Sequence, residues 1–105
     1  AMRRIVKPAI TGTLESSDVL IRIEPNPGKG IDIHLDSVVM MQFGESIKET
    51  ARGVLDDFGI ADARLVINDK GAVDAAIKAR MQTAVCRAAD IPHDWSREDG
   101  VAYGG

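Results

Sequence analysis

Hydrophobic and polar residues alternate in two short segments of the chain, VLIRIE at 19–24 and IDIHLD at 31–36. Alternation with a period of two puts the apolar side chains on one face, which is typical of a strand with one buried side. The PNPGKG segment between them contains two prolines and two glycines, so it favours a turn. These patterns predict two half-buried strands joined as a β-hairpin, with a loop longer than the tight two-residue kind.

From residue 37 onward, apolar residues recur every three or four positions, which predicts a long amphipathic helix. Asp36 or Ser37 is suited to cap its start, and Gly59 is suited to end it. A second helical pattern covers 72–88. The apolar stripes of the two helices predict a shared core that contains Phe43, Ile47, Leu55, Phe58, Ile77, Met81 and Val85.

Two further segments have strand character. ARLVIND at 63–69 predicts a third strand, and VKPAI at 6–10 is a candidate edge strand in which Pro8 limits the pairing. The order is therefore strand, strand, helix, strand, helix. We predict an α+β fold with a small, mainly antiparallel sheet of three to four strands and two helices packed on one face.

The length of the chain bounds its domain organisation. It has 105 residues, of which 45% are hydrophobic, and this is enough for one domain with a modest core. We predict that the domain covers 1–89 and that 90–105, which lacks periodicity and ends in Gly, is a flexible tail. Ala1, which precedes Met2, is interpreted as an added residue outside the domain.

Charge and hydropathy argue against two classes of partner. The net charge of −3 disfavours the dense positive patch that nucleic-acid binding needs. No apolar stretch approaches the roughly 20 residues that span a bilayer, and the N-terminal segment lacks the apolar core of a secretion signal. The single cysteine, Cys86, cannot form an internal disulfide, which agrees with a reducing compartment. We expect a cytoplasmic protein that binds neither nucleic acid nor membrane.

The chain lacks the residue patterns of self-contained catalysis. His34 and His93 are far apart in the sequence, so metal-ligand spacing is absent. Cys86 lies beside the apolar stripe of the second predicted helix, where a small buried residue is a better explanation than a nucleophile. PNPGKG joins two predicted strands, whereas a phosphate-binding loop joins a strand to a helix. We expect no catalytic residue and no metal site.

The stretch GTLESSDV at 12–19 has two interpretations. Ser and Asp side chains bond to nearby backbone, so the stretch could be an ordinary loop that leads into the strand at 19–24. Alternatively, one of its hydroxyls is an attachment point, because a serine that another enzyme modifies needs access but no activating base of its own. A small sheet covered on one face also suits a ligand-binding regulatory module or a structural subunit.

Three segments together resemble a known family. KPAITGTLESSDVLIRIEP at 7–25, DSVVMMQFGESI at 36–47 and DKGAVDAAIKARMQTAVCRA at 69–88 closely resemble the acyl carrier (gamma) subunits of citrate lyase. The resemblance runs in order from about Ile5 to Ala88, and IPHDW at 91–95 is similar to the tail of such subunits. The elements GTLES-x-D and DKGA-x-D are more specific together than either is alone.

The resemblance implies a site and a set of partners. Ser16, which follows Thr-Leu-Glu, would carry a phosphodiester-linked prosthetic group related to phosphoribosyl dephospho-coenzyme A that ends in a thiol; Ser17 is the alternative residue. We therefore expect Ser16 to be exposed, in an irregular segment outside any helix. The carrier itself would be non-catalytic. Its arm would hold an acetyl thioester, which the alpha subunit of citrate lyase exchanges for citryl and the beta subunit cleaves to oxaloacetate. A prosthetic-group transferase would load the arm. Malonate decarboxylase has a related carrier, so malonate or citramalate are alternative substrates.

Overall fold

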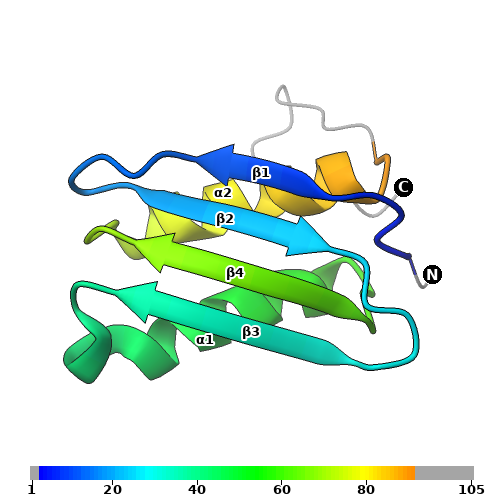
Figure 1. Ribbon diagram of the computed structural model, residues 1–105, viewed down its shortest axis with the longest axis horizontal. Helices are drawn as coiled ribbons and strands as arrows, with labels where there is room; N and C mark the ends of the chain where they lie inside the picture. The colour runs from blue at the N-terminus through cyan, green and yellow to red at the C-terminus, as the bar shows by residue number, and fades with distance from the viewer. Residues whose placement is uncertain (1–2, 92–105) are drawn as a thin grey trace.

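A computed structural model describes residues 3–91 of the chain. Its elements are β1 (Ala9–Gly12), β2 (Val19–Glu24), β3 (Ile31–Ser37), α1 (Met40–Asp57), β4 (Ala63–Asp69) and α2 (Asp74–Ala88). Figure 1 shows one layer of sheet with both helices behind it, which confirms the predicted α+β fold. The predicted tail from residue 92 onward and His93 lie outside the described residues, and the boundary at residue 89 stays a prediction.

The sheet is mixed, with the strand order β1-β2-β4-β3. β1 pairs antiparallel with β2, and β2 pairs antiparallel with β4, whereas β3 pairs parallel with β4. The predicted hairpin between 19–24 and 31–36 is therefore wrong, because β4 lies between these two strands. The segment 25–30 carries the chain past the end of β4 (Figure 1). Alternation identified both strands correctly but contains no information about which strand pairs with which.

The first helix begins two or three residues later than a cap at Ser37 or Asp36 predicts. Val39 occupies the N-cap position of α1, and no side chain caps the helix there. The Ser37 hydroxyl instead donates to Asp69 Oδ2 at 2.7 Å and accepts from the Val39 N–H at 3.1 Å. The prediction that Asp36 or Ser37 caps the helix is thus wrong. Gly59 does adopt the left-handed conformation expected after a helix end, with φ of 69°.

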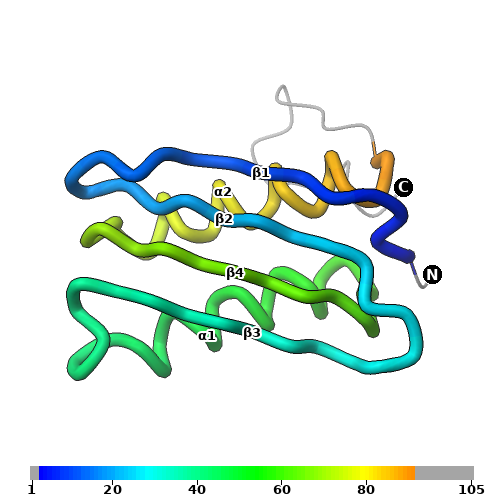
Figure 2. The backbone as a smooth tube through the Cα atoms, in the orientation of Figure 1, coloured from blue at the N-terminus to red at the C-terminus, as the bar shows by residue number. Residues whose placement is uncertain are grey.

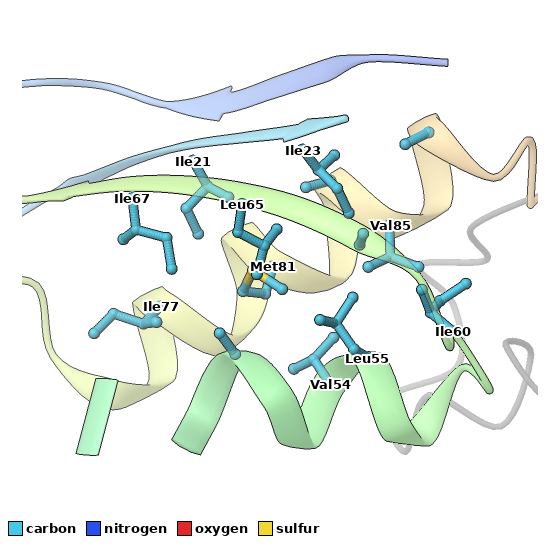
Figure 3. Packing of buried hydrophobic residues seen from close by; sticks show 14 of the residues in the cluster. Ile21, Ile23, Val54, Leu55, Ile60, Leu65, Ile67, Ile77, Met81 and Val85 are labelled. Carbon is cyan, nitrogen blue, oxygen red and sulfur yellow. The ribbon is translucent and has the colours of Figure 1, made fainter. Parts of the chain in front are cut away.

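The core lies between the sheet and the two helices, as Figure 3 shows. Alternate residues of β2 and β4 point into it, and Ile21, Ile23, Leu65 and Ile67 are fully buried. The helices contribute the predicted core residues Ile47, Leu55, Phe58, Ile77, Met81 and Val85, all of which are buried.

Phe43 is the exception among the predicted core residues, because its side chain is 52% exposed. All four residues of the first turn of α1, 40–43, are exposed. Figure 2 shows this turn at the lower left of the molecule, outside the end of β3. The helical spacing is thus correct at Phe43, but the layer against which it would pack ends before it.

Three connections leave the sheet at the same end. Val19 at the start of β2 and Ser37 at the end of β3 are both paired with Asp69, the last residue of β4. The β1–β2 loop, the β4–α2 loop and the β3–α1 junction therefore lie together, at the left of Figure 1. None of the helices within residues 3–91 is long and apolar enough to cross a membrane.

Candidate functional site

Ser16 lies at the tip of the β1–β2 loop. The Asp18 N–H donates to the Glu15 carbonyl at 3.1 Å, which closes a β-turn over residues 15–18 with Ser16 second and Ser17 third. Ser17 has φ of 65° and Ser16 does not have a positive φ, as in type II turns. Ser16 is exposed and outside any helix or strand, as the sequence predicts. Within residues 3–91 no hydrogen bond involves its hydroxyl.

Asp18 fixes the base of this loop. Its Oδ2 accepts from Thr13 Oγ1 at 2.6 Å, and its Oδ1 accepts from the Val19 N–H at 2.7 Å. Arg80 of α2 donates to the same carboxylate, with Nη2 3.0 Å from Oδ2 and Nε 3.3 Å from Oδ1. The Thr13 bond, then the Val19 N–H and Arg80, lower the pKa of Asp18 to about 2. The carboxylate is therefore ionised at neutral pH and keeps the hydrogen bonds that hold the base of the loop together.

Backbone hydrogen bonds tie the same loop to the segment that follows β4. The Ser17 N–H donates to the Lys70 carbonyl at 2.8 Å, and the Lys70 N–H donates to the Asp18 carbonyl at 2.9 Å. The loop is thus held at its base by side chains and beside its tip by backbone. Since Ser16 itself is not engaged in these contacts, its side chain is presented to solvent from a fixed position.

Asp69 stabilises the β4–α2 loop, which follows it in the chain. Its side chain is 1% exposed, and its carboxylate accepts from the Ser37 hydroxyl at 2.7 Å and from the Ala72 N–H at 3.0 Å. A buried carboxylate needs such partners. The DKGA-x-D element therefore holds the β4–α2 loop in the shape that receives the backbone of Ser17 and Asp18.

Gly12 is the last residue of β1, and the β1–β2 loop begins after it. It has φ of 84°, and a Cβ atom built on it would lie 1.7 Å from the Val19 carbonyl oxygen. No side chain fits there without moving the backbone. Thr11, just before it, donates from Oγ1 to the Arg80 carbonyl at 2.9 Å, so both the strand and the loop are tied to the same residue of α2.

Sequence reasoning missed the roles of Asp18, Asp69 and Arg80. Asp18 and Arg80 are 62 positions apart, and neither periodicity nor local spacing connects them. The one available signal was that they fall within the two segments, 7–25 and 69–88, that carry the family resemblance.

The other candidate residues are not part of this site. His34 is exposed in the middle of β3, opposite Val66. Cys86 is buried, with 4% exposure, and burial raises the pKa of its thiol, so it is a poor nucleophile. In the part of the chain that the structure describes, no group of three or more His, Cys, Asp or Glu residues could hold a metal ion.

These observations define what Ser16 can do. No carboxylate or imidazole within residues 3–91 hydrogen-bonds to its hydroxyl, so the site lacks the base that a serine nucleophile needs for its own catalysis. The hydroxyl is nevertheless open to a second protein that brings such a base. The geometry therefore fits a residue to which a group is attached by another enzyme.

Comparison with known proteins identifies relatives of the chain. Residues 6–88 match the family model described as malonate decarboxylase delta subunit (MdcD). The chain is 48% identical over 95 residues to the citrate lyase acyl carrier protein of Vibrio cholerae, which covers 90% of this chain and 97% of that protein. It is 49% identical over 86 residues to the protein of the same name from Escherichia fergusonii, covering 82% of this chain and 89% of the relative.

Comparison of structures identifies the fold independently of sequence. A chain in the crystal structure of a Pseudomonas malonate decarboxylase hetero-tetramer in complex with malonate superposes with a TM-score of 0.71. The match covers 84% of this chain and 90% of that chain at 17% identity, so it shows a shared fold only. The sequence matches are far closer, and they show that the chain belongs to the citrate lyase acyl carrier protein family.

Proposed function

We propose that the chain is the acyl carrier subunit of a citrate lyase complex and that Ser16 holds its prosthetic group covalently. The observation that supports this most strongly is the position of Ser16: its hydroxyl is exposed and unengaged, while the residues around it are fixed by Asp18 and Arg80. An ordinary turn needs only local bonds, whereas here a side chain from α2 stabilises the base of the loop.

The proposed group is a phosphoribosyl dephospho-coenzyme A type arm, joined to Ser16 Oγ by a phosphodiester. When attached, it supplies the thiol that carries acetyl and citryl groups. The chain itself holds Ser16, the attachment residue, in a fixed position. Thr13, Asp18 and Arg80 hold the loop base, and the exposed turn leaves room around Ser16 Oγ. The carrier is non-catalytic in this account.

The proposed partners are the alpha subunit, which exchanges acyl groups, the beta subunit, which cleaves the citryl group, and the transferase that loads the arm. Tethering keeps the acyl group at a high effective concentration near both active sites in turn. We place the complex in the cytoplasm, which agrees with a single cysteine that cannot form an internal disulfide.

Ser17 is the less suitable attachment residue. Its side chain is also exposed, but its N–H is bonded to Lys70 and its backbone is in the left-handed region. Any group on Ser17 would start beside the Lys70 segment, whereas no hydrogen bond ties Ser16 to that segment within residues 3–91. We therefore keep Ser16 as the site.

A malonate decarboxylase carrier is the second candidate, since the family model and the structural neighbour both bear that name. The substrate assay decides between them. Native carrier, assayed with the catalytic subunits of its own complex, should support release of oxaloacetate from citrate and no release of carbon dioxide from malonate. Turnover of malonate with no turnover of citrate would assign the chain to the decarboxylase instead.

A further inference from the structure

Exposed apolar side chains gather at the end of the molecule that bears Ser16. Nine large hydrophobic side chains are exposed in residues 3–91, and six of them belong to the three connections at this end or to the first turn of α1. We call these six the apolar end surface: Leu14, Val38, Met40, Met41, Phe43 and Val73. Met41 is 100% exposed and Val73 is 70% exposed, so neither contributes to the core. Contiguous exposed apolar surface of this kind marks interaction sites.

Contacts between the three connections bring these side chains to one end of the molecule. Leu14 lies in the same loop as Ser16, and that loop is bonded through Ser17 to Lys70. On the other side of Lys70, a Cβ atom at Gly71 would lie 3.9 Å from Val38 Cγ2. The Val38 N–H donates to the Asp69 carbonyl at 3.2 Å. The connections that carry these side chains therefore lie next to one another, from the Ser16 loop across the β4–α2 loop to the first turn of α1.

We propose that the apolar end surface is where the catalytic subunits of the carrier's own complex dock, through an apolar rim around the active-site opening that receives the arm. This inference rests on the proposed function, because it takes Ser16 as the point from which the arm leaves. A partner that accepts the arm must approach the Ser16 end, and that end carries most of the exposed large apolar side chains of the described residues. Two methionines in the surface suit successive partners, since the flexible thioether side chain adapts to different shapes.

The size of the surface fits a docking interface. The exposed parts of its six side chains amount to on the order of 500 Å², close to the largest apolar patch of a typical monomer. A standard interface takes roughly 800 Å² from each partner, and somewhat more than half of that area is apolar. The apolar end surface can therefore supply the apolar part of one such interface.

Other occupants of the surface fit less well. A second copy of the chain would cover Ser16 and obstruct the arm. The described chain ends at Ile91, far from Met41 and Phe43, because α2 carries it away from the Ser16 end over about 22 Å.

The test compares three single variants of the native, arm-bearing carrier. Met41→Glu and Phe43→Glu place a charge in the apolar end surface. Ile10→Glu is the control, since Ile10 of β1 is 55% exposed, close to the 52% of Phe43, and the change in charge is the same. Affinity for the purified catalytic subunits is measured by calorimetry, and thermal melts confirm that each variant is folded.

We expect Kd to rise about tenfold or more for Met41→Glu and Phe43→Glu, and to stay within about twofold for Ile10→Glu. Equal affinities for all four proteins, or an equal loss in the control, would overturn the proposal. Two other results would also overturn the proposal. A loss of arm loading with unchanged Kd would assign the surface to the transferase. A wild-type dimer that Met41→Glu dissociates would assign it to a second copy of the chain. The mass of the carrier reports separately on the proposed function: a bare Ser16 would contradict that function whatever the affinities are.

Discussion

Replacement of Ser16 by Ala should abolish the carrier's activity and leave its fold intact. The Ser16 hydroxyl makes no hydrogen bond within residues 3–91 and its side chain is exposed, so the free energy of unfolding should change by no more than about 0.5 kcal/mol. Activity should fall to background, because no other residue offers the tether at that position. Chemical denaturation of the variant, together with an assay of the complex reconstituted with transferase-treated carrier, measures both effects.

Ser17→Ala is the matched control for this experiment. It removes a hydroxyl from the same turn, keeps the Ser17 N–H bond to Lys70, and should retain activity. Full activity of the Ser16→Ala complex would refute attachment at Ser16. Loss of activity in Ser17→Ala alone would move the attachment site by one residue, and a large loss of stability in Ser16→Ala would show that its hydroxyl has a structural role.

Gly12→Ala should have the largest effect on the loop as a whole. The added Cβ would lie 1.7 Å from the Val19 carbonyl oxygen, at a φ of 84° that Ala rarely adopts. Relief of this overlap requires the end of β1 and the start of β2 to separate. We expect destabilisation of about 2–4 kcal/mol and slower loading by the transferase, measured by chemical denaturation and by mass spectrometry of the loaded fraction.

Gly53→Ala serves as the control for Gly12→Ala. Gly53 is an exposed residue of α1, and a Cβ atom there would meet nothing within 4 Å. The same chemical change should therefore stabilise the protein by about 0.5–1 kcal/mol, because Ala favours the helix. A Gly12→Ala variant as stable as the wild type would show that the loop can shift without cost.

Elements could be predicted from the sequence because each is specified by its own residues. The alternation in 19–24 and 31–36 and the helical stripes identified β2, β3, α1 and α2 within a few residues. Strand pairing could not be predicted, since β4 comes between β2 and β3 in the sheet and nothing in the alternation distinguishes that order from a hairpin. Phe43 was misplaced for a related reason: periodicity gives the face of a helix but not where the opposing sheet ends.

The candidate site was partly predictable. The exposure of Ser16 in a turn was expected from its polar neighbours and is confirmed. The interaction between Asp18 and Arg80 was not expected, because it depends on how α2 packs beside the β1–β2 loop. Asp69 looked like the end of a strand, and its bonds to Ser37 and Ala72 become visible only once β3, β4 and α2 are placed together.

The central claim, that Ser16 bears a covalent arm, is tested most directly by the intact mass of carrier purified within its native complex, followed by peptide mapping. The account predicts an added mass equal to a phosphodiester-linked phosphoribosyl dephospho-coenzyme A type group, found on the peptide that contains 13–18 and localised to Ser16. Carrier produced without the transferase should lack it. Native carrier with an unmodified Ser16 throughout would contradict the account.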